Sequence, residues 1–209
     1  MEYPKTETLY KREFVPGYTK PRGLLIGEFS RPEFGLINQW RVEEKIDGMN
    51  IRVYISPGNI TIQGRGKDSQ LPPKLITYFH ENQRLQANQI DYNLQLFGEG
   101  FGAGIQKGGV YRPDMAFILF DVLIDGKWGT RADVKVTAEL FDFDTPHDYG
   151  MMTTEQIVDF VKSKPLGRYR DTLPNHKPYP SEGIIARSEP LLFNMHNERC
   201  MFKLKVKDF

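Results

Sequence analysis

The sequence predicts an α+β fold in which mostly antiparallel sheets are accompanied by a few peripheral helices. Short apolar stretches alternate with polar residues and are separated by turn residues, whereas only two segments have helical periodicity. Of the 209 residues, 39% are hydrophobic and 26% are charged, which provides enough apolar material for a core. The length suits one domain, and we expect residues 1–209 to form it.

The strand signals begin with a β-hairpin over residues 50–64. Ile51, Val53 and Ile55 alternate with polar residues there, and Ser56-Pro57-Gly58-Asn59 is a turn sequence. The segment 116–124 ends at the tight-turn pair Asp125-Gly126. The full set of further strands that we expect is residues 94–97, 116–124, 183–186 and 200–206.

Two helices are expected, each from its apolar spacing. The first covers residues 73–85, with four side chains near one face: Leu75, Ile76, Tyr78 and Phe79. The second begins at Thr153, with Gln156 as its capping-box partner, and ends at Lys164-Pro165. Its apolar stripe consists of Ile157, Phe160 and Val161. Residues 167–181 contain three prolines, and we expect them to form an ordered surface crossing.

Charge is distributed unevenly, although the formal net charge is only +1. Residues 162–207 contain ten basic and four acidic side chains, whereas residues 133–159 contain seven acidic side chains and one basic one. Clustered positive charge attracts phosphates through counterion release. A solvated basic face is the alternative that charge alone leaves equally open.

Several features concern the cellular setting. Cys200 is the only cysteine, so an intramolecular disulfide is impossible. The longest apolar run, residues 115–124, is interrupted by Asp121 and is too short to span a bilayer. The first residues do not have the pattern of a signal peptide. We therefore expect an intracellular, cytoplasmic protein without a membrane partner.

Lys45 is the strongest candidate for a chemical role. It lies in the segment Glu43-Glu44-Lys45-Ile46-Asp47-Gly48. A free lysine amine has a pKa of about 10.4, so a nucleophilic lysine needs a desolvated pocket with other cations close by. The alternative is that Asp47-Gly48 is an ordinary hairpin turn that follows an exposed lysine.

The last strand supplies such cations. Alternation along residues 201–207 places Phe202, Leu204 and Val206 on one face and places three lysines on the other, Lys203, Lys205 and Lys207. Ammonium groups on one face repel one another unless an anion binds over them, and phosphate is the natural candidate. The alternative is an amphipathic edge strand whose lysines prevent aggregation.

Two carboxylates and one guanidinium complete the candidate set. Glu99 and Glu182 each lie beside glycine at an expected strand end, and carboxylates hold Mg²⁺ or Mn²⁺ in phosphoryl transfer. Arg65 follows the hairpin and could grip a phosphate bidentately. Each of the three could instead be an ordinary surface or turn residue. The glycine-rich residues 98–109 lack the strand-helix-strand context of a dinucleotide loop.

Taken in order, these motifs resemble the covalent lysine nucleotidyltransferase superfamily of DNA ligases, RNA ligases and mRNA-capping enzymes. The nick-sealing type of ATP-dependent phage RNA ligase is the most similar. The resemblance runs from about Glu43 to the end of the sequence, with weaker similarity around residues 5–12. It implies the α+β nucleotidyltransferase (adenylation) domain and a phosphoramidate bond between Lys45 and AMP. Lys-Ile-Asp-Gly is also common in DNA ligases. The assignment to RNA ligases therefore rests mainly on Asn50 and on a third motif within residues 98–107.

The resemblance also implies roles for the other candidates. Glu43 or Glu44 would face the adenine, since strand alternation favours the first and the RNA-ligase pattern the second. Gly98-Glu99 with Gly104-Ile105-Gln106-Lys107 is similar to the third motif. ATP and AMP would be bound by eight residues: Glu43, Glu44, Asn50, Arg65, Glu99, Phe120, Lys203 and Lys205. Among these, Phe120 would stack on adenine. The metal would be held by Glu99 and Glu182.

The function that the resemblance implies is ATP-dependent joining of 5′-phosphate and 3′-hydroxyl ends, with ATP and Mg²⁺ or Mn²⁺ as cofactors. The partner would be a nicked duplex of RNA, DNA or a hybrid. The sequence ends four residues after Lys205, so no C-terminal OB domain is expected, and a separate clamp or end-healing protein could supply its role. A DNA ligase core, a capping guanylyltransferase and a non-catalytic nucleic-acid-binding relative are the alternatives.

Overall fold

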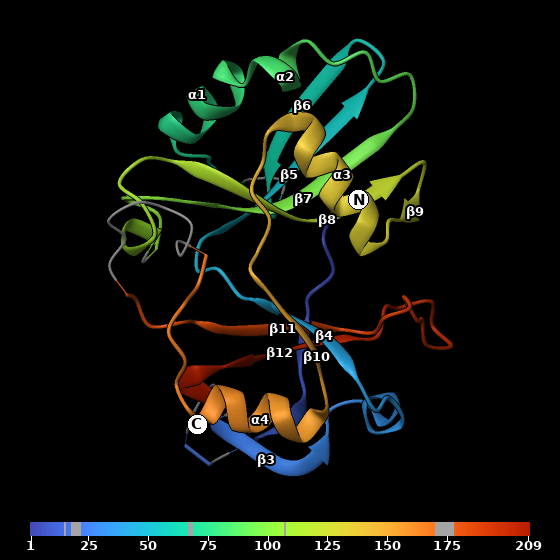
Figure 1. Ribbon diagram of the computed structural model, residues 1–209, viewed down its shortest axis with the longest axis vertical. Coiled ribbons are helices and arrows are strands. Elements are labelled where there is room, and N and C mark those ends of the chain that lie inside the picture. Colours follow the sequence, from blue (N-terminus) through green and yellow to red (C-terminus); the bar gives the residue numbers. More distant parts are fainter. Residues whose placement is uncertain (15, 18–21, 67–68, 107, 170–177) are drawn as a thin grey trace. The chain divides into compact units, whose positions relative to one another are not determined.

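The computed structural model describes residues 1–14, 16–17, 22–66, 69–106, 108–169 and 178–209. Its elements form two compact units (Figure 1). The first unit consists of Met1–Pro4 and Ile46–Pro146, and the second consists of Lys5–Lys45 and His147–Phe209. The α+β class is confirmed, because antiparallel pairs dominate the sheets of both units. That residues 1–209 act as one domain stays a prediction.

The first unit is built on one antiparallel sheet with the strand order β6-β5-β7-β8-β9. The predicted hairpin is confirmed as β5 (Met49–Ser56) and β6 (Asn59–Gly64), and Ser56 pairs with Asn59 at its turn. The other strands are β7 (Leu94–Phe101), β8 (Ala116–Ile124) and β9 (Lys127–Trp128). Strand β8 has the bounds that the sequence predicted.

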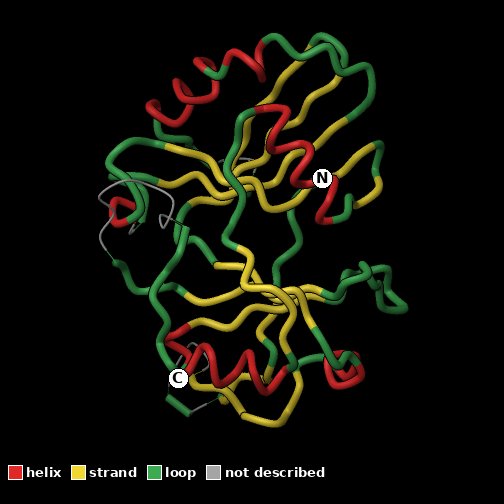
Figure 2. Tube along the Cα trace, in the orientation of Figure 1, coloured by secondary structure: helices red, strands yellow, loops and turns green. Residues whose placement is uncertain are grey.

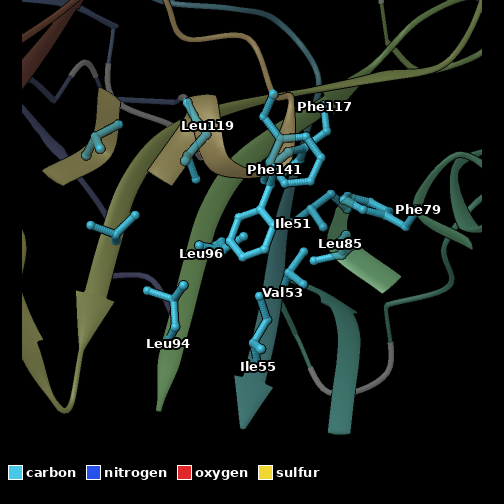
Figure 3. Packing of buried hydrophobic residues seen from close by; sticks show 14 of the residues in the cluster. Ile51, Val53, Ile55, Phe79, Leu85, Leu94, Leu96, Phe117, Leu119 and Phe141 are labelled. Atoms are coloured by element: carbon cyan, nitrogen blue, oxygen red, sulfur yellow. The ribbon is translucent and has the colours of Figure 1, made fainter. Parts of the chain in front are cut away.

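Three helices of the first unit bury apolar side chains on the core of this sheet: α1 (Pro73–Glu81), α2 (Gln83–Gln86) and α3 (Arg131–Phe141). Figure 3 shows how Ile51, Val53 and Ile55 of β5 face Phe79 and Leu85 from the first two helices. Period-2 alternation along β5 puts these three residues on one face of the strand. A short 3-10 helix, Gly108–Val110, lies between β7 and β8 in the chain.

The second unit contains a five-stranded sheet with the order β1-β12-β11-β4-β10. Its strands are β1 (Glu7–Thr8), β12 (Met201–Lys205), β11 (Gly183–Arg187), β4 (Trp40–Glu44) and β10 (Asp148–Met152), and only the β1–β12 pair is parallel. Helix α4 (Thr154–Lys162) packs on one face of this sheet (Figures 1 and 2). Strands β2 (Tyr10–Glu13) and β3 (Arg22–Phe29) form a separate pair. Two 3-10 helices complete the unit, Pro32–Leu36 and Val206–Asp208.

The predicted helix at Thr153 is confirmed, but the predicted helix over residues 73–85 is interrupted. Thr153 and Gln156 form the capping box of α4. Asn82 ends α1 and caps α2, because its side chain accepts a hydrogen bond from the N–H of Leu85. Ile76, which the sequence placed on the buried face, is 37% exposed. The surface crossing predicted over residues 167–181 lies partly outside the described residues, which omit 170–177.

The structure differs from the sequence prediction at one further helix and at the last strand. Helix α3 was not predicted, although Thr130 and Asp133 form a capping box at its start. The strand predicted over residues 200–206 ends at Lys205, because Val206 begins a 3-10 turn. Lys207 therefore does not continue the lysine face of β12, and its side chain is exposed.

Candidate active site

Lys45, Glu182 and Lys205 form a compact ionic cluster in the second unit. The Lys45 ammonium donates to Oε2 of Glu182 over 2.7 Å, and the Lys205 ammonium donates to Oε1 of the same carboxylate. The side chains of Lys45, Glu182 and Lys205 are 19%, 15% and 20% exposed. One carboxylate thus holds two ammonium groups in a largely desolvated place.

The strand pairing explains why these residues meet although they are far apart in the chain. Strand β11 lies between β4 and β12, and Lys45 directly follows β4. The N–H of Lys45 donates to the carbonyl of Gly183 over 3.0 Å, while Gly183 pairs with Lys205 on the other side. A Cβ on Gly183 would lie 2.1 Å from the carbonyl oxygen of Leu204, so this approach of β11 to β12 requires glycine.

Lys203 adds a third amine to this region. It lies two residues before Lys205 on β12, and no carboxylate of the described residues forms an ion pair with it. Burial, followed by repulsion from Lys205 and Lys45, lowers the pKa of Lys203 to about 8. Weaker repulsion comes from Lys5 and Arg12. The cation cluster that the sequence predicted around Lys45 is therefore present in the second unit.

Glu43 and Glu44 are both buried and both engaged within the second unit. Glu43 forms an ion pair with Arg187, with 2.8 Å between its Oε2 and Nη2. Glu44 accepts a hydrogen bond of 2.8 Å at Oε1 from the Tyr179 hydroxyl, and its Oε2 accepts from the N–H groups of Arg168 and Tyr169. A role of either glutamate in facing adenine stays a prediction.

In the first unit, Asn50 and Glu99 lie directly opposite each other on β5 and β7. The buried Oδ1 of Asn50 has no hydrogen-bond partner among the described residues. A Cβ on Gly48 would lie 2.4 Å from the Gly100 carbonyl oxygen and 2.8 Å from Cγ of Glu99, so glycine is required where residue 48 meets β7. Glu99 lies inside β7, not at the strand end that the sequence predicted, because pairing continues to Phe101.

The remaining predicted residues of the first unit are Phe120 and Arg65. Phe120 lies on β8 with its ring partly exposed and 5.1 Å from the ring of Tyr3. Arg65 directly follows β6, as predicted, and its guanidinium is half exposed and 4.0 Å from Glu2. Lys107 of the proposed third motif lies outside the described residues.

The structure also identifies functional candidates that the sequence analysis missed. Arg187 and Tyr179 anchor the two glutamates that precede Lys45. Neither residue has a local signal, because each meets its partner through tertiary contact over more than 130 residues of chain. The charges of Lys5 and Arg12 help to lower the pKa of Lys203. The weak similarity noted for residues 5–12 was the only sequence signal for these two residues.

Glu182 is the carboxylate of the ionic cluster that could hold a metal ion. The residues that the structure describes contain no group of three or more His, Cys, Asp and Glu side chains placed to hold a metal ion. Glu182 is one carboxylate whose oxygens already receive two ammonium groups. Mg²⁺ commonly takes only one or two protein carboxylates and completes its shell with water and substrate phosphates, so a single carboxylate fits that kind of site.

Within the described residues, no helix is long and apolar enough to cross a membrane.

The fold of the chain is similar to that of RNA ligase from Naegleria gruberi. A variant of that protein solved with ATP and Mn matches with a TM-score of 0.59 and 16% identity over 98% of this chain and 60% of that chain. The ligase solved with PPi matches with a TM-score of 0.60 and 17% identity over 98% and 61%. This chain thus spans about three fifths of the length of those solved chains. No significant match was found among curated proteins.

At such low identity the structural likeness shows the fold alone. The family model of RNA ligases matches residues 38–205, which is about four fifths of the sequence. This range contains Lys45, Glu182 and the eight residues to which the resemblance assigns ATP and AMP binding. The chain belongs to the RNA ligase family.

Proposed function

We propose that this protein is an ATP-dependent RNA ligase that joins 5′-phosphate and 3′-hydroxyl ends through AMP bound covalently to Lys45. The observation that carries the proposal is the cluster of Lys45, Glu182 and Lys205, beside Lys203, in a chain of the RNA ligase family. A buried group of amines around one carboxylate suits a phosphate ligand and an attacking lysine.

In the first step, the neutral amine of Lys45 attacks the α-phosphorus of ATP. The N–P bond forms as the bond from that phosphorus to the bridging oxygen breaks, and pyrophosphate leaves with the bonding electrons. Before the attack, the Lys45 ammonium passes one proton through Oε2 of Glu182, which lies 2.7 Å from Nζ, to water. A second proton leaves the nitrogen for water when the N–P bond forms. Lys203 and Lys205 then face the α-phosphate and stabilise the charge that builds up on its oxygens.

A divalent cation, held by Glu182 and the substrate phosphates, would neutralise charge on the departing pyrophosphate. The metal-binding role that the resemblance implies for Glu99 is also part of the proposal. Recognition of the nucleoside is assigned to the remaining predicted residues. Asn50 offers a buried side-chain oxygen with no partner among the described residues, and Phe120 offers a partly exposed ring, both suited to a nucleoside.

Two further transfers complete the reaction. The 5′-phosphate of a nick attacks the phosphorus of the lysine-bound AMP, which breaks the N–P bond and returns the electron pair and a proton to Lys45. The adjacent 3′-hydroxyl then attacks the activated 5′-phosphate, and AMP leaves. The proposed partner is therefore a nicked duplex, and a separate protein that clamps or heals the ends is compatible with this role.

The experiment is incubation of the protein with ATP labelled at the α-phosphate, in the presence of Mg²⁺ and then Mn²⁺. We expect label on the protein that is lost in both Lys45→Ala and Lys45→Arg. The arginine variant keeps a positive charge but cannot be deprotonated, so it separates nucleophilic chemistry from charge. Circular dichroism of both variants verifies that they fold. Label that persists in folded Lys45→Arg would contradict the proposal.

Two comparisons sharpen the assignment. GTP labelled at the same position should give no label, since a capping guanylyltransferase would prefer it. Nicked duplexes with RNA, DNA or mixed strands, supplied with ATP or already adenylated at the 5′-phosphate, then identify the sugar preference. Absence of joining on every pre-adenylated nick would favour the non-catalytic relative.

A further inference from the structure

An open groove of about 810 Å³ lies within the second unit, lined mainly by the N-terminal residues 5–12 and by the last residues of the chain, 203–208. Its cationic lining comes from two distant segments of the chain, residues 5–12 and 203–207, and comprises Lys5, Lys11, Arg12, Lys203, Lys205 and Lys207. The parallel pairing of β1 with β12 brings the two segments together, since Thr8 pairs with Lys203. The fold therefore concentrates positive charge along one groove.

The carboxylates in the lining neutralise only a part of this charge. Asp208 forms an ion pair of 2.9 Å with Arg12, and Glu7 lies 3.3 Å from Arg31. Lys11 has only an exposed contact of 3.5 Å with Glu28, and in the described part of the chain no carboxylate lies within ion-pair distance of Lys5, Lys203 or Lys207. Arg12 is thus paired with Asp208 and Lys205 with Glu182, whereas Lys5, Lys203 and Lys207 keep the groove positive.

The groove is continuous with the site around Lys45, because Lys203 and Lys205 belong to both. The same field is felt at Lys203, whose pKa is lowered by burial and then by Lys205, Lys45, Lys5 and Arg12. Cations from the groove and from the site thus act on one amine. An anion that bound along the groove would relieve this repulsion and would lead directly to Lys45.

We propose that this groove binds the sugar-phosphate backbone of a nucleic-acid strand and guides its 5′-phosphate end to Lys45. The inference rests on the proposed ligase function and adds a substrate-binding surface to it. Its specific content is that Lys5, Lys11 and Lys207 contact successive backbone phosphates without reading base identity.

The main competing ligand of the same chemistry is the phosphate tail of ATP. Lys203 and Lys205, which are partly buried and adjacent to Lys45, are sufficient for the phosphates nearest to the nucleophile. Lys5, Lys11 and Lys207 are exposed and extend the lining beyond these two. Exposed lysines on flexible stems are suited to a polyanion whose charges recur along its length, which favours a nucleic-acid strand.

The test compares two triple variants with the same change of net charge. In the groove variant, Lys5, Lys11 and Lys207 are all replaced by Gln. In the control variant, three exposed lysines of the first unit are replaced by Gln instead: Lys74, Lys127 and Lys135. Fluorescence anisotropy with a labelled nicked RNA duplex gives the Kd of each protein over a series of salt concentrations. Labelling by ATP gives the KM for lysine adenylation separately.

For the groove variant, we expect the Kd for the nicked duplex to rise at least about tenfold. The slope of log K against log salt should become less steep by about 2.7, since each lost phosphate contact on a duplex removes about 0.9. Any rise in its KM for ATP should be at least fivefold smaller than the rise in Kd. The control variant should resemble the unmodified protein in both measurements.

Equal binding by the two triple variants would overturn the groove proposal, and so would a loss confined to the KM for ATP, which would assign the groove to the nucleotide tail. The proposed function fails separately. If the unmodified protein is not labelled by ATP but the groove variant still loses duplex binding and salt dependence, the groove proposal stands and the ligase proposal falls.

Discussion

Replacement of Lys203 by Met should stabilise the nucleotide-free protein at neutral pH. The fold lowers the pKa of Lys203 from 10.5 to about 8, so a protonated Lys203 is less favourable in the folded state than in the unfolded one. The difference corresponds to about 3 kcal/mol. Since the side chain is only partly buried, solvent screening reduces this to about 1–2 kcal/mol. We expect Lys203→Met to raise the free energy of unfolding by that amount at pH 7.

The same reasoning fixes the pH dependence. Between pH 8 and 10.5 the unfolded state binds more protons at residue 203 than the folded state, so the stability of the unmodified protein rises with pH through this window. Below about pH 8 the amine is protonated in both states, and the folded state carries the full cost. The advantage of Lys203→Met should therefore shrink by more than half between pH 7 and about pH 9.5.

Urea unfolding at the two pH values measures the effect. Lys203→Gln keeps a polar head group and separates the electrostatic gain from added apolar burial. Lys135→Met, at an exposed position of α3, is the matched control and should change stability by less than about 0.5 kcal/mol. If Lys203→Met destabilises the protein at pH 7, or if its gain is the same at both pH values, the electrostatic account of this cluster is wrong.

Three further substitutions test local packing, hydrogen bonding and helix capping by their effect on the free energy of unfolding. Gly48→Ala should cost about 1–3 kcal/mol, because the new Cβ would lie 2.4 Å from the carbonyl oxygen of Gly100. Tyr179→Phe should cost about 1.5–3 kcal/mol, since it removes the 2.8 Å hydrogen bond to the buried carboxylate of Glu44. Thr153→Ala should cost about 1 kcal/mol through loss of the cap of α4.

Each of these predictions has a control of the same chemical type. Gly66→Ala places its Cβ no closer than 3.5 Å to Ser69 and should be nearly neutral. Tyr54→Phe removes an exposed hydrogen bond to Asn93 and should cost less than Tyr179→Phe. Thr77→Ala removes an exposed bond to a helix carbonyl instead of a cap. Equal effects within any pair would refute the explanation given for that site.

Local patterns predicted the parts of the fold that depend on neighbouring residues. Alternation fixed the hairpin of residues 50–64 and the buried face of β12, where Phe202 and Leu204 have no exposed surface. The capping signal at Thr153 gave the start of α4. Helix α3 was missed although Thr130 and Asp133 supply the same type of signal. The reason is that apolar residues alternate with polar ones over residues 132–140, a period of two that is typical of a strand.

The sequence by itself determined that the segment around Lys45 and the strand that carries Lys203 and Lys205 occur in the order that is typical of ligases. Only the tertiary structure decided that Glu182 pairs with both Lys45 and Lys205, that Glu43 and Glu44 are already engaged, and that residues 5–12 meet the last strand in a basic groove. The physical reason is that periodicity records which face a side chain takes within its own strand. Which strands lie side by side, and in what register, depends on burial and pairing between segments more than a hundred residues apart.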